Sequence, residues 1–208
     1  MTWDLLNALG IAAFAVSGAL IAIEEKYDIF GIYVLGFVTA FGGGIIRNVL
    51  IGLPVSMLWE QEIFIYIALF AVTLISMSPS LWLQSVKKWL DFFDAIGLAA
   101  FSIQGALFAV KTEMPLVAVI VASVLTGIGG GIVRDLLAGR KPLVFHKEVY
   151  ALWAILSGIV IGCNLVSEAW EYYIVFVLVV TLRMLSTFYE WKLPGRLVRE
   201  RKTARLFR

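Results

Sequence analysis

The phrase GGGIIRNVLIG at residues 42–52 recurs as GGGIVRDLLAG at residues 129–139, and the rest of the chain is arranged around these two copies. Each copy places three consecutive glycines and an arginine inside a run of otherwise apolar residues. Glycine lowers helix stability by about 1 kcal/mol relative to alanine, and arginine costs at least about 2.5 kcal/mol near the centre of a bilayer. Because these unfavourable residues occur at matched places, we expect each copy to build part of a functional site.

The composition is that of an integral membrane protein. Of the 208 residues, 61% are hydrophobic and 15% are charged, whereas about 25% are charged in soluble domains. The mean hydropathy is +0.93. Seven apolar stretches are long enough for helices that cross a hydrocarbon core of about 30 Å, at residues 4–23, 29–51, 62–80, 92–110, 115–138, 149–167 and 171–189. We therefore predict an all-α protein with a single membrane domain over 1–190 and a basic cytoplasmic tail over 191–208.

The two copies belong to a longer internal repeat. An offset of 87 residues pairs Phe14 with Phe101 and continues through the glycines, which assigns repeat 1 to about 4–80 and repeat 2 to about 91–167. Each repeat holds three predicted spans. Because three is an odd number, the second repeat enters the membrane from the opposite side, which defines an inverted-topology repeat. The seventh helix, about 171–189, lies outside the repeat.

Basic residues in the loops indicate the orientation, because they are enriched on the cytoplasmic side of a membrane. The predicted inner loops carry most of them: Lys26, Lys87, Lys88, Arg140, Lys141 and Lys147. The predicted outer loops carry only Lys111. We therefore predict a multi-pass protein of the cell inner membrane with its N-terminus outside and its C-terminus in the cytoplasm. The basic tail is a candidate for binding anionic lipid, whereas nucleic-acid binding is not expected because no folded basic surface lies behind it.

We predict that both glycine triplets break their helices near the middle of the membrane. The triplets are Gly42, Gly43 and Gly44 in the second span and Gly129, Gly130 and Gly131 in the fifth. In transporters and channels built from inverted repeats, broken helices place backbone groups beside a permeant ion or substrate. The alternative is that the glycines only let neighbouring helices pack closely, although a single small residue every fourth position would suffice for that.

The residues that follow the triplets are predicted to form a polar layer. Arg47 is followed by Asn48, and Arg134 is followed by Asp135. Neighbouring residues on a helix point about 100° apart, so we expect pairing across the pseudo-two-fold axis, Arg134 with Asn48 and Arg47 with Asp135. Such a layer would close the pore or select at it. An equally weighted alternative is that both arginines snorkel to opposite interfaces.

Four more polar residues occupy matched positions and are candidates for lining a pathway: Ser17, Gln104, Thr39 and Thr126. Ser17 and Gln104 either line the pathway or form hydrogen bonds between helices. Thr39 and Thr126 lie one turn before the triplets, and each either bonds to its own helix or faces the pore.

Cofactor and enzyme signatures are absent from the sequence. The lone His146 lacks a second ligand and Cys163 is the only cysteine, so no metal site or cofactor is expected. A dinucleotide fingerprint fails because its third glycine falls at Ile132, and we predict no enzyme. Lys147 and Glu148, beside His146, are candidates for a cytoplasmic gate.

The doubled phrase Gly-Gly-Gly-x-x-Arg-Asn/Asp-x-Leu-x-Gly, followed by Pro54 or Pro142, resembles that of the bacterial two-repeat membrane family called glycine-transporter-like. That family is similar to the prokaryotic trimeric intracellular cation (TRIC) channels. The resemblance covers about residues 4–167. It implies a homotrimer with one pore through each seven-helix protomer, and permeation of monovalent cations, chiefly potassium, with sodium as a further candidate. The first copy has Asn48 where the second has Asp135, so one carboxylate of a symmetric pair is missing.

Two functions follow from these observations. The first is a cation channel. The second is a secondary transporter of a small zwitterion such as glycine, whose carboxylate a helix N-terminus could hold. We favour the channel, although an arginine at a cation pore repels the permeant ion unless Asp135 or backbone carbonyls neutralise it.

Overall fold

The structure is a computed structural model that describes residues 2–60, 62–78, 86–145 and 149–191. In these ranges the regular elements are helices, which confirms the all-α prediction. The α-helices are α1 (Thr2–Glu24), α2 (Ile29–Ile51), α3 (Glu62–Ser76), α5 (Val86–Lys111), α6 (Leu116–Leu137), α7 (Tyr150–Gly162) and α8 (Ala169–Phe188). Two short 3₁₀ helices, η1 (Val55–Leu58) and η2 (Leu143–Phe145), follow α2 and α6.

The described helices correspond to the seven predicted spans. Five of them, α1, α2, α5, α6 and α8, are long and apolar enough to cross a membrane. The other two are apolar but shorter than predicted, with 15 residues in α3 and 13 in α7. The helix α7 ends early because Asn164, two residues after Gly162, has a left-handed backbone with a φ of 51°.

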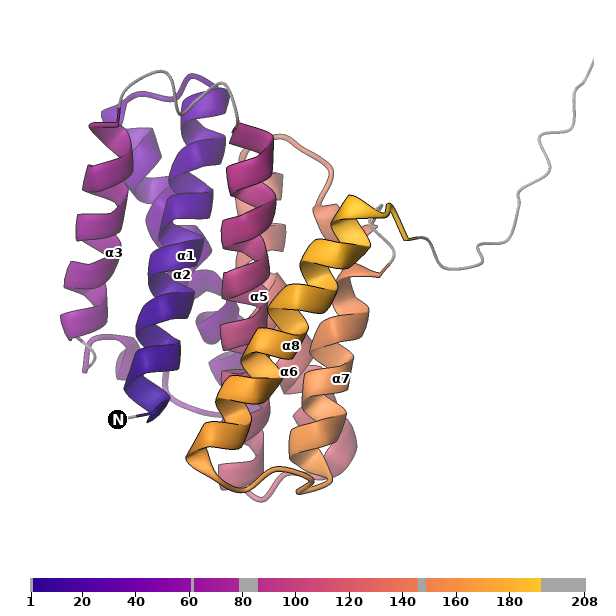
Figure 1. Cartoon of the computed structure of the whole chain (residues 1–208). Helices are drawn as coiled ribbons and strands as arrows, with labels where there is room; N and C mark the ends of the chain where they lie inside the picture. The colour runs from indigo at the N-terminus through magenta and orange to yellow at the C-terminus, as the bar shows by residue number, and fades with distance from the viewer. Residues whose placement is uncertain (1, 61, 79–85, 146–148, 192–208) are drawn as a thin grey trace, which may run out of the picture.

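The helices pack as an inverted repeat. In Figure 1, α1, α2 and α3 run in directions opposite to their counterparts α5, α6 and α7. The helix α1 packs on α2 and α5, and α6 packs on the same two helices, so these four form the centre. The helices α3 and α7 pack in equivalent places, α3 on α1 and α2 and α7 on α5 and α6.

The seventh helix lies outside this arrangement. The helix α8 packs across α5 and α7 on the side of the bundle away from α3 (Figure 1). Only 22% of its membrane-spanning stretch is buried, whereas 78% is buried in α1. The apolar outer face of α8 is therefore available to lipid or to another subunit.

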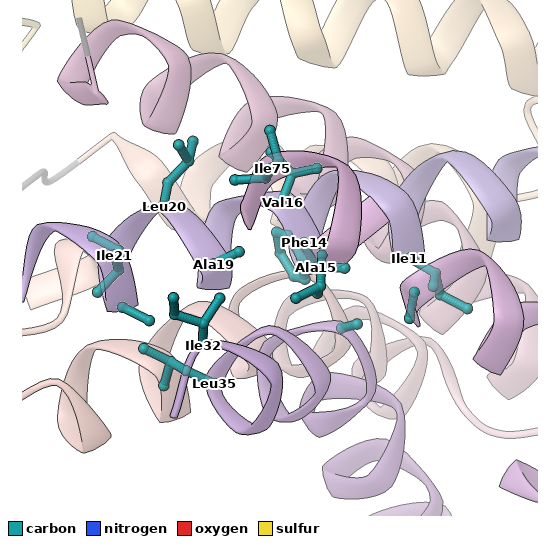
Figure 2. Packing of buried hydrophobic residues seen from close by; sticks show 14 of the residues in the cluster. Ile11, Phe14, Ala15, Val16, Ala19, Leu20, Ile21, Ile32, Leu35 and Ile75 are labelled. Atoms are coloured by element: carbon teal, nitrogen blue, oxygen red, sulfur yellow. The ribbon is translucent and has the colours of Figure 1, made fainter. Parts of the chain in front are cut away.

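Small residues allow the central helices to approach one another. Ala15 and Ala19 of α1 and Ala99 of α5 are fully buried, and close packing of small residues is a main source of helix association in membranes. Figure 2 shows an apolar cluster built mainly from the first repeat, in which side chains of α1 such as Phe14 and Ala19 lie between α2 and α3. A second cluster joins α5, α6, α7 and α8.

Matched glycines end the two helices that carry the repeated phrase. Gly52 after α2 and Gly139 after α6 are left-handed, with φ values of 73° and 70°, a conformation that glycine adopts without strain. The backbone carbonyls of Asn48 and Asp135 each accept a hydrogen bond of 2.8 Å from the residue five positions later. Each arginine of the phrase therefore lies about one turn before a helix end.

The predicted breaks at the glycine triplets are wrong. The helices α2 and α6 run without interruption from Ile29 to Ile51 and from Leu116 to Leu137. Uninterrupted hydrogen bonding is expected here, since a bilayer offers no water to replace lost helical bonds. The glycines serve close packing instead. A Cβ on Gly43 would lie well under 3.0 Å from the carbonyl oxygen of Thr126.

Candidate pore and its two polar ends

The centre of the molecule is a tight crossing of α2 and α6. Gly43 faces the backbone of Thr126, and by the same geometry Gly130 faces the backbone of Thr39. The hydroxyls of Thr39 and Thr126 each donate to a carbonyl four residues earlier in their own helix, at 2.6 Å in both cases. The bond to the threonine's own helix, one of the two predicted roles, is therefore present at both residues. The other role, facing a pore, stays a prediction.

Two matched aromatic rings fill the space beside this crossing. The rings of Phe14 and Phe101 meet edge to face with their centroids 5.2 Å apart. Phe14 is fully buried and borders the place where Gly130 lacks a side chain. Rings and backbone thus close the centre, and the polar residues of the repeated phrase lie on either side of it.

On one side lies the Arg134 cluster, made of Arg134, Asp94, Asp135 and Ser17. Arg134 donates from Nε to Asp135 Oδ1 at 2.8 Å and from Nη1 to Asp94 Oδ1 at 2.9 Å. Its Nη1 also donates to the Ser17 hydroxyl from the other repeat. Arg134 and Asp94 are both 0% exposed. The buried guanidinium is therefore held by two carboxylates.

On the other side, Arg47 has a different environment. Its Nε and Nη2 donate to Asn48 Oδ1 at 3.1 and 2.8 Å, and its guanidinium carbon lies 3.8 Å from the centre of the Phe108 ring. Arg47 and Asn48 line a cavity of about 50 Å³ together with Asn7 and Gln104. We call this space the Arg47 cavity.

The two sides are related residue by residue through the repeat. The offset of 87 pairs Arg47 with Arg134 and Asn48 with Asp135. The same offset pairs Asn7 with Asp94 and Gln104 with Ser17. Acids thus surround the arginine of the second repeat, whereas amides surround the arginine of the first.

The predicted pairing across the axis is wrong, because the crossing at Gly43 and Gly130 separates the two polar groups. Each arginine instead bonds to the next residue on its own helix, since its long side chain can curl back to its neighbour. The snorkelling alternative is also wrong, since Arg134 is 0% exposed and Arg47 only 7%. A role for these residues in a pore remains a prediction.

Asn48 and Asp135 have a second task that the sequence did not reveal. Asp135 Oδ2 accepts a hydrogen bond of 3.0 Å from the backbone N–H of Leu143. Asn48 Nδ2 donates to the carbonyl of Pro54 at 3.2 Å. Each residue therefore fixes its arginine and also the loop that follows its helix.

Asp94 is the main site residue that sequence reasoning missed. A usable signal existed, because the offset of 87 pairs it with Asn7 and both are polar residues within predicted membrane spans, 92–110 and 4–23. Tyr150 was also missed, and the place of Arg183 in the last span predicts only that it snorkels to the interface, which is wrong. Arg183 is 2% exposed and its guanidinium carbon lies 4.5 Å from the centre of the Tyr150 ring, so it is buried in the protein.

The loop after α6 is tied to the end of α1. Arg140 pairs with Glu24 at 2.9 Å and also with Glu25. The candidate gate residues Lys147 and Glu148 lie outside the described residues. No group of three His, Cys, Asp or Glu side chains that could hold a metal occurs in the described ranges.

The fold and the two polar ends define a multi-pass α-helical membrane protein built from an inverted repeat. The model of the family described as Glycine transporter matches residues 4–79 and 91–165, one segment in each half, and the chain belongs to this family.

Curated relatives extend this finding. The UPF0126 membrane protein YvgT of Bacillus subtilis is 57% identical over 196 residues, which cover 94% of this chain and 97% of YvgT. The UPF0126 inner membrane protein YadS of Escherichia coli K12 is 38% identical over 157 residues, which cover 74% of this chain and 75% of YadS.

Solved structures of TRIC channels share the fold. A TRIC cation channel analysed for the basis of its conductance has 35% identity and a TM-score of 0.81, over 94% of this chain and 98% of the channel. A prokaryotic TRIC channel crystallised in 0.5 M KCl has 30% identity and a TM-score of 0.82, over 92% and 98%. The orthologue from Rhodobacter sphaeroides has 28% identity and a TM-score of 0.81, over 91% and 98%. These relatives are ion channels rather than enzymes, which confirms the prediction that the chain is not an enzyme.

Proposed function

We propose that the chain is a monovalent cation channel that conducts chiefly potassium. The observation that carries the proposal is the match to a TRIC cation channel with 35% identity and a TM-score of 0.81 over 94% of this chain. The match covers nearly all of the fold. The polar ends on either side of the α2 and α6 crossing suit a path through the protomer.

In the proposed path, a cation enters one polar end, passes the crossing and leaves by the other. At the end near α1's C-terminus, a cavity of about 450 Å³ is lined by Asp135, Arg140 and Lys141 among others. Asp94 and Asp135 offset the charge of Arg134, so this end does not repel a cation through that residue. Because backbone meets backbone at Gly43 and Gly130, conduction requires α2 and α6 to separate there. The arrangement described here is then the closed form.

We further propose a homotrimer with one pore in each protomer. The Rhodobacter relative is a trimeric intracellular cation channel, and the sparsely buried α8 offers an apolar surface for subunit contact or lipid. The same proposal places the protein in the cell inner membrane with the N-terminus outside. Residues 192–208 of the predicted tail (191–208), which would contact anionic lipid, lie outside the described residues.

The competing function is secondary transport of a small zwitterion such as glycine. The family description favours it, as does the Arg47 cavity, where a guanidinium could hold a carboxylate. The channel is preferred because the likeness to TRIC cation channels extends over more than nine-tenths of the chain.

Paired flux measurements separate the two functions. Purified protein is reconstituted in liposomes loaded with a potassium salt, and potassium efflux and uptake of labelled glycine are followed in parallel, with protein-free liposomes as the control. Potassium efflux without glycine accumulation is expected. Glycine accumulation against its gradient, with potassium retained, would replace the channel by the transporter.

A further inference from the structure

The Arg47 cavity contains a buried positive charge and no acid. None of the described residues that line it is an aspartate or a glutamate. The guanidinium bonds to the amide of Asn48, and the amides of Asn7 and Gln104 also line the cavity, whereas two carboxylates contact the matched Arg134. An isolated charge at this depth is costly unless a counter-charge accompanies it.

Hydrogen-bond donors also remain unused in this cavity. The two bonds from Arg47 to Asn48 use two of the five N–H groups of the guanidinium. The Nε2 amide of Gln104 is buried and has no hydrogen-bond partner among the described residues. Gln104 is 3% exposed and lines the cavity. Both donors favour a ligand that accepts hydrogen bonds.

We propose that the Arg47 cavity binds a small monovalent anion, a halide or a small carboxylate, between the Arg47 guanidinium and the Gln104 amide. The volume of about 50 Å³ exceeds the roughly 10–15 Å³ that one water molecule needs, and it is too small for a lipid headgroup or a nucleotide. Apolar walls such as Phe101 and Phe108 strengthen the charge-assisted bonds by excluding water.

Anion binding would give both arginines a negative counter-charge: the occupied Arg47 cavity would have a formal charge of 0, and the Arg134 cluster, with two carboxylates, has a formal charge of −1. The Arg134 cluster has fixed counter-charges in Asp94 and Asp135, and the Arg47 cavity would take an exchangeable one from solution. The consequence for conduction rests on the proposed channel function: an occupied site no longer repels the permeant cation. Binding itself does not depend on conduction.

The test is thermal unfolding of the purified full-length protein in detergent, at constant potassium and a constant ionic strength of about 0.15 M. Gluconate, which is too large for the cavity, is replaced stepwise by chloride in one series and by formate in another. Binding at ten times the dissociation constant is expected to raise the melting temperature by about 3–6 °C.

Three variants make the test specific. Arg47→Gln removes the charge, and the shift should disappear. Asn48→Asp builds in the carboxylate that the second repeat has at Asp135, and it should also remove the shift while Arg47 stays in place. Arg140→Gln removes a cation that is 28% exposed and outside the cavity, and the shift should persist.

The two anion series identify the ligand. A shift with chloride alone indicates a halide site, and a shift with formate alone indicates a carboxylate site; both results support the proposal. Equal melting temperatures in gluconate, chloride and formate would overturn it, as would a full shift in Asn48→Asp. Line broadening of chloride-35 resonances by the protein provides a second readout if Arg47→Gln does not fold. Since neither measurement requires ion flow, a failed channel assay leaves this result independent.

Discussion

Alanine substitutions at different glycines of one triplet should have opposite effects on thermal stability. A Cβ at Gly43 would lie well under 3.0 Å from the carbonyl oxygen of Thr126, so α2 and α6 would have to separate by about 1 Å to restore ordinary contact. At Gly42 and Gly44 the nearest atoms to an added Cβ would be 3.8 and 3.9 Å away, which is ordinary contact.

The expected energies follow from these distances. Overpacking costs about 1–3 kcal/mol, whereas alanine gains about 1 kcal/mol of helix propensity over glycine. Gly43→Ala should therefore be about 1–3 kcal/mol less stable than Gly42→Ala or Gly44→Ala. The latter two gain helix propensity without an overpacking cost. For a chain of this size about 1 kcal/mol changes the melting temperature by about 2–4 °C, so the difference should be about 2–12 °C.

The assay is thermal unfolding of the three purified variants beside the unaltered protein, with monodispersity checked by size-exclusion chromatography. Gly130→Ala should behave like Gly43→Ala, because its Cβ would meet the carbonyl oxygen of Thr39 in the same way. Equal melting temperatures for Gly42→Ala and Gly43→Ala would refute the reasoning. That result would mean that the contact between Gly43 and Thr126 does not limit helix packing, and it would reopen the interpretation of the triplet as a helix break.

Two further substitutions compare a buried ion pair with an exposed one. Asp94→Ala should cost about 3–5 kcal/mol, because it removes one of the two carboxylates that hold the fully buried Arg134. Glu24→Ala should cost at most about 1 kcal/mol, because its pair with Arg140 is solvated, with the side chains 46% and 28% exposed. Denaturant or thermal unfolding measures both, and added salt should shrink only the Glu24 effect. Losses of equal size would contradict the assigned burial of the Arg134 cluster.

The helical architecture could be predicted because the bilayer acts on composition directly. Seven long apolar stretches correspond to seven helices in the described residues, and the offset of 87 correctly implied two sets of helices running in opposite directions. Gly52 and Gly139 marked the ends of the repeated phrase, and in the structure each adopts the left-handed conformation that follows a helix.

The site was less predictable, because the same residue type occurs in several different structural settings. Glycines occur both in broken helices and at close helix crossings, and the position of Thr126 opposite Gly43 shows that this triplet serves a crossing. The hydrogen-bond partners of Arg134 depend on the rotamer of its long side chain, which the sequence does not specify. Its Cβ direction argued against Asp135, yet the guanidinium reaches that carboxylate at 2.8 Å.

One prediction failed for a reason already present in the sequence. An inverted repeat sends matched residues to opposite ends of the bundle, so Arg47 and Asp135 could not form one layer. The same logic would have paired Asn7 with Asp94 and pointed to the difference between the acidic and amide environments. The difference between Asn48 and Asp135 is one part of this contrast between amides around Arg47 and carboxylates around Arg134.

The most direct measurement of the central claim is single-channel recording of the purified protein in a planar bilayer under a potassium chloride gradient. Discrete openings whose current reverses near the potassium equilibrium potential are expected for a cation channel. Openings that reverse near the chloride equilibrium potential, or a bilayer that stays silent at both polarities of voltage, would contradict it.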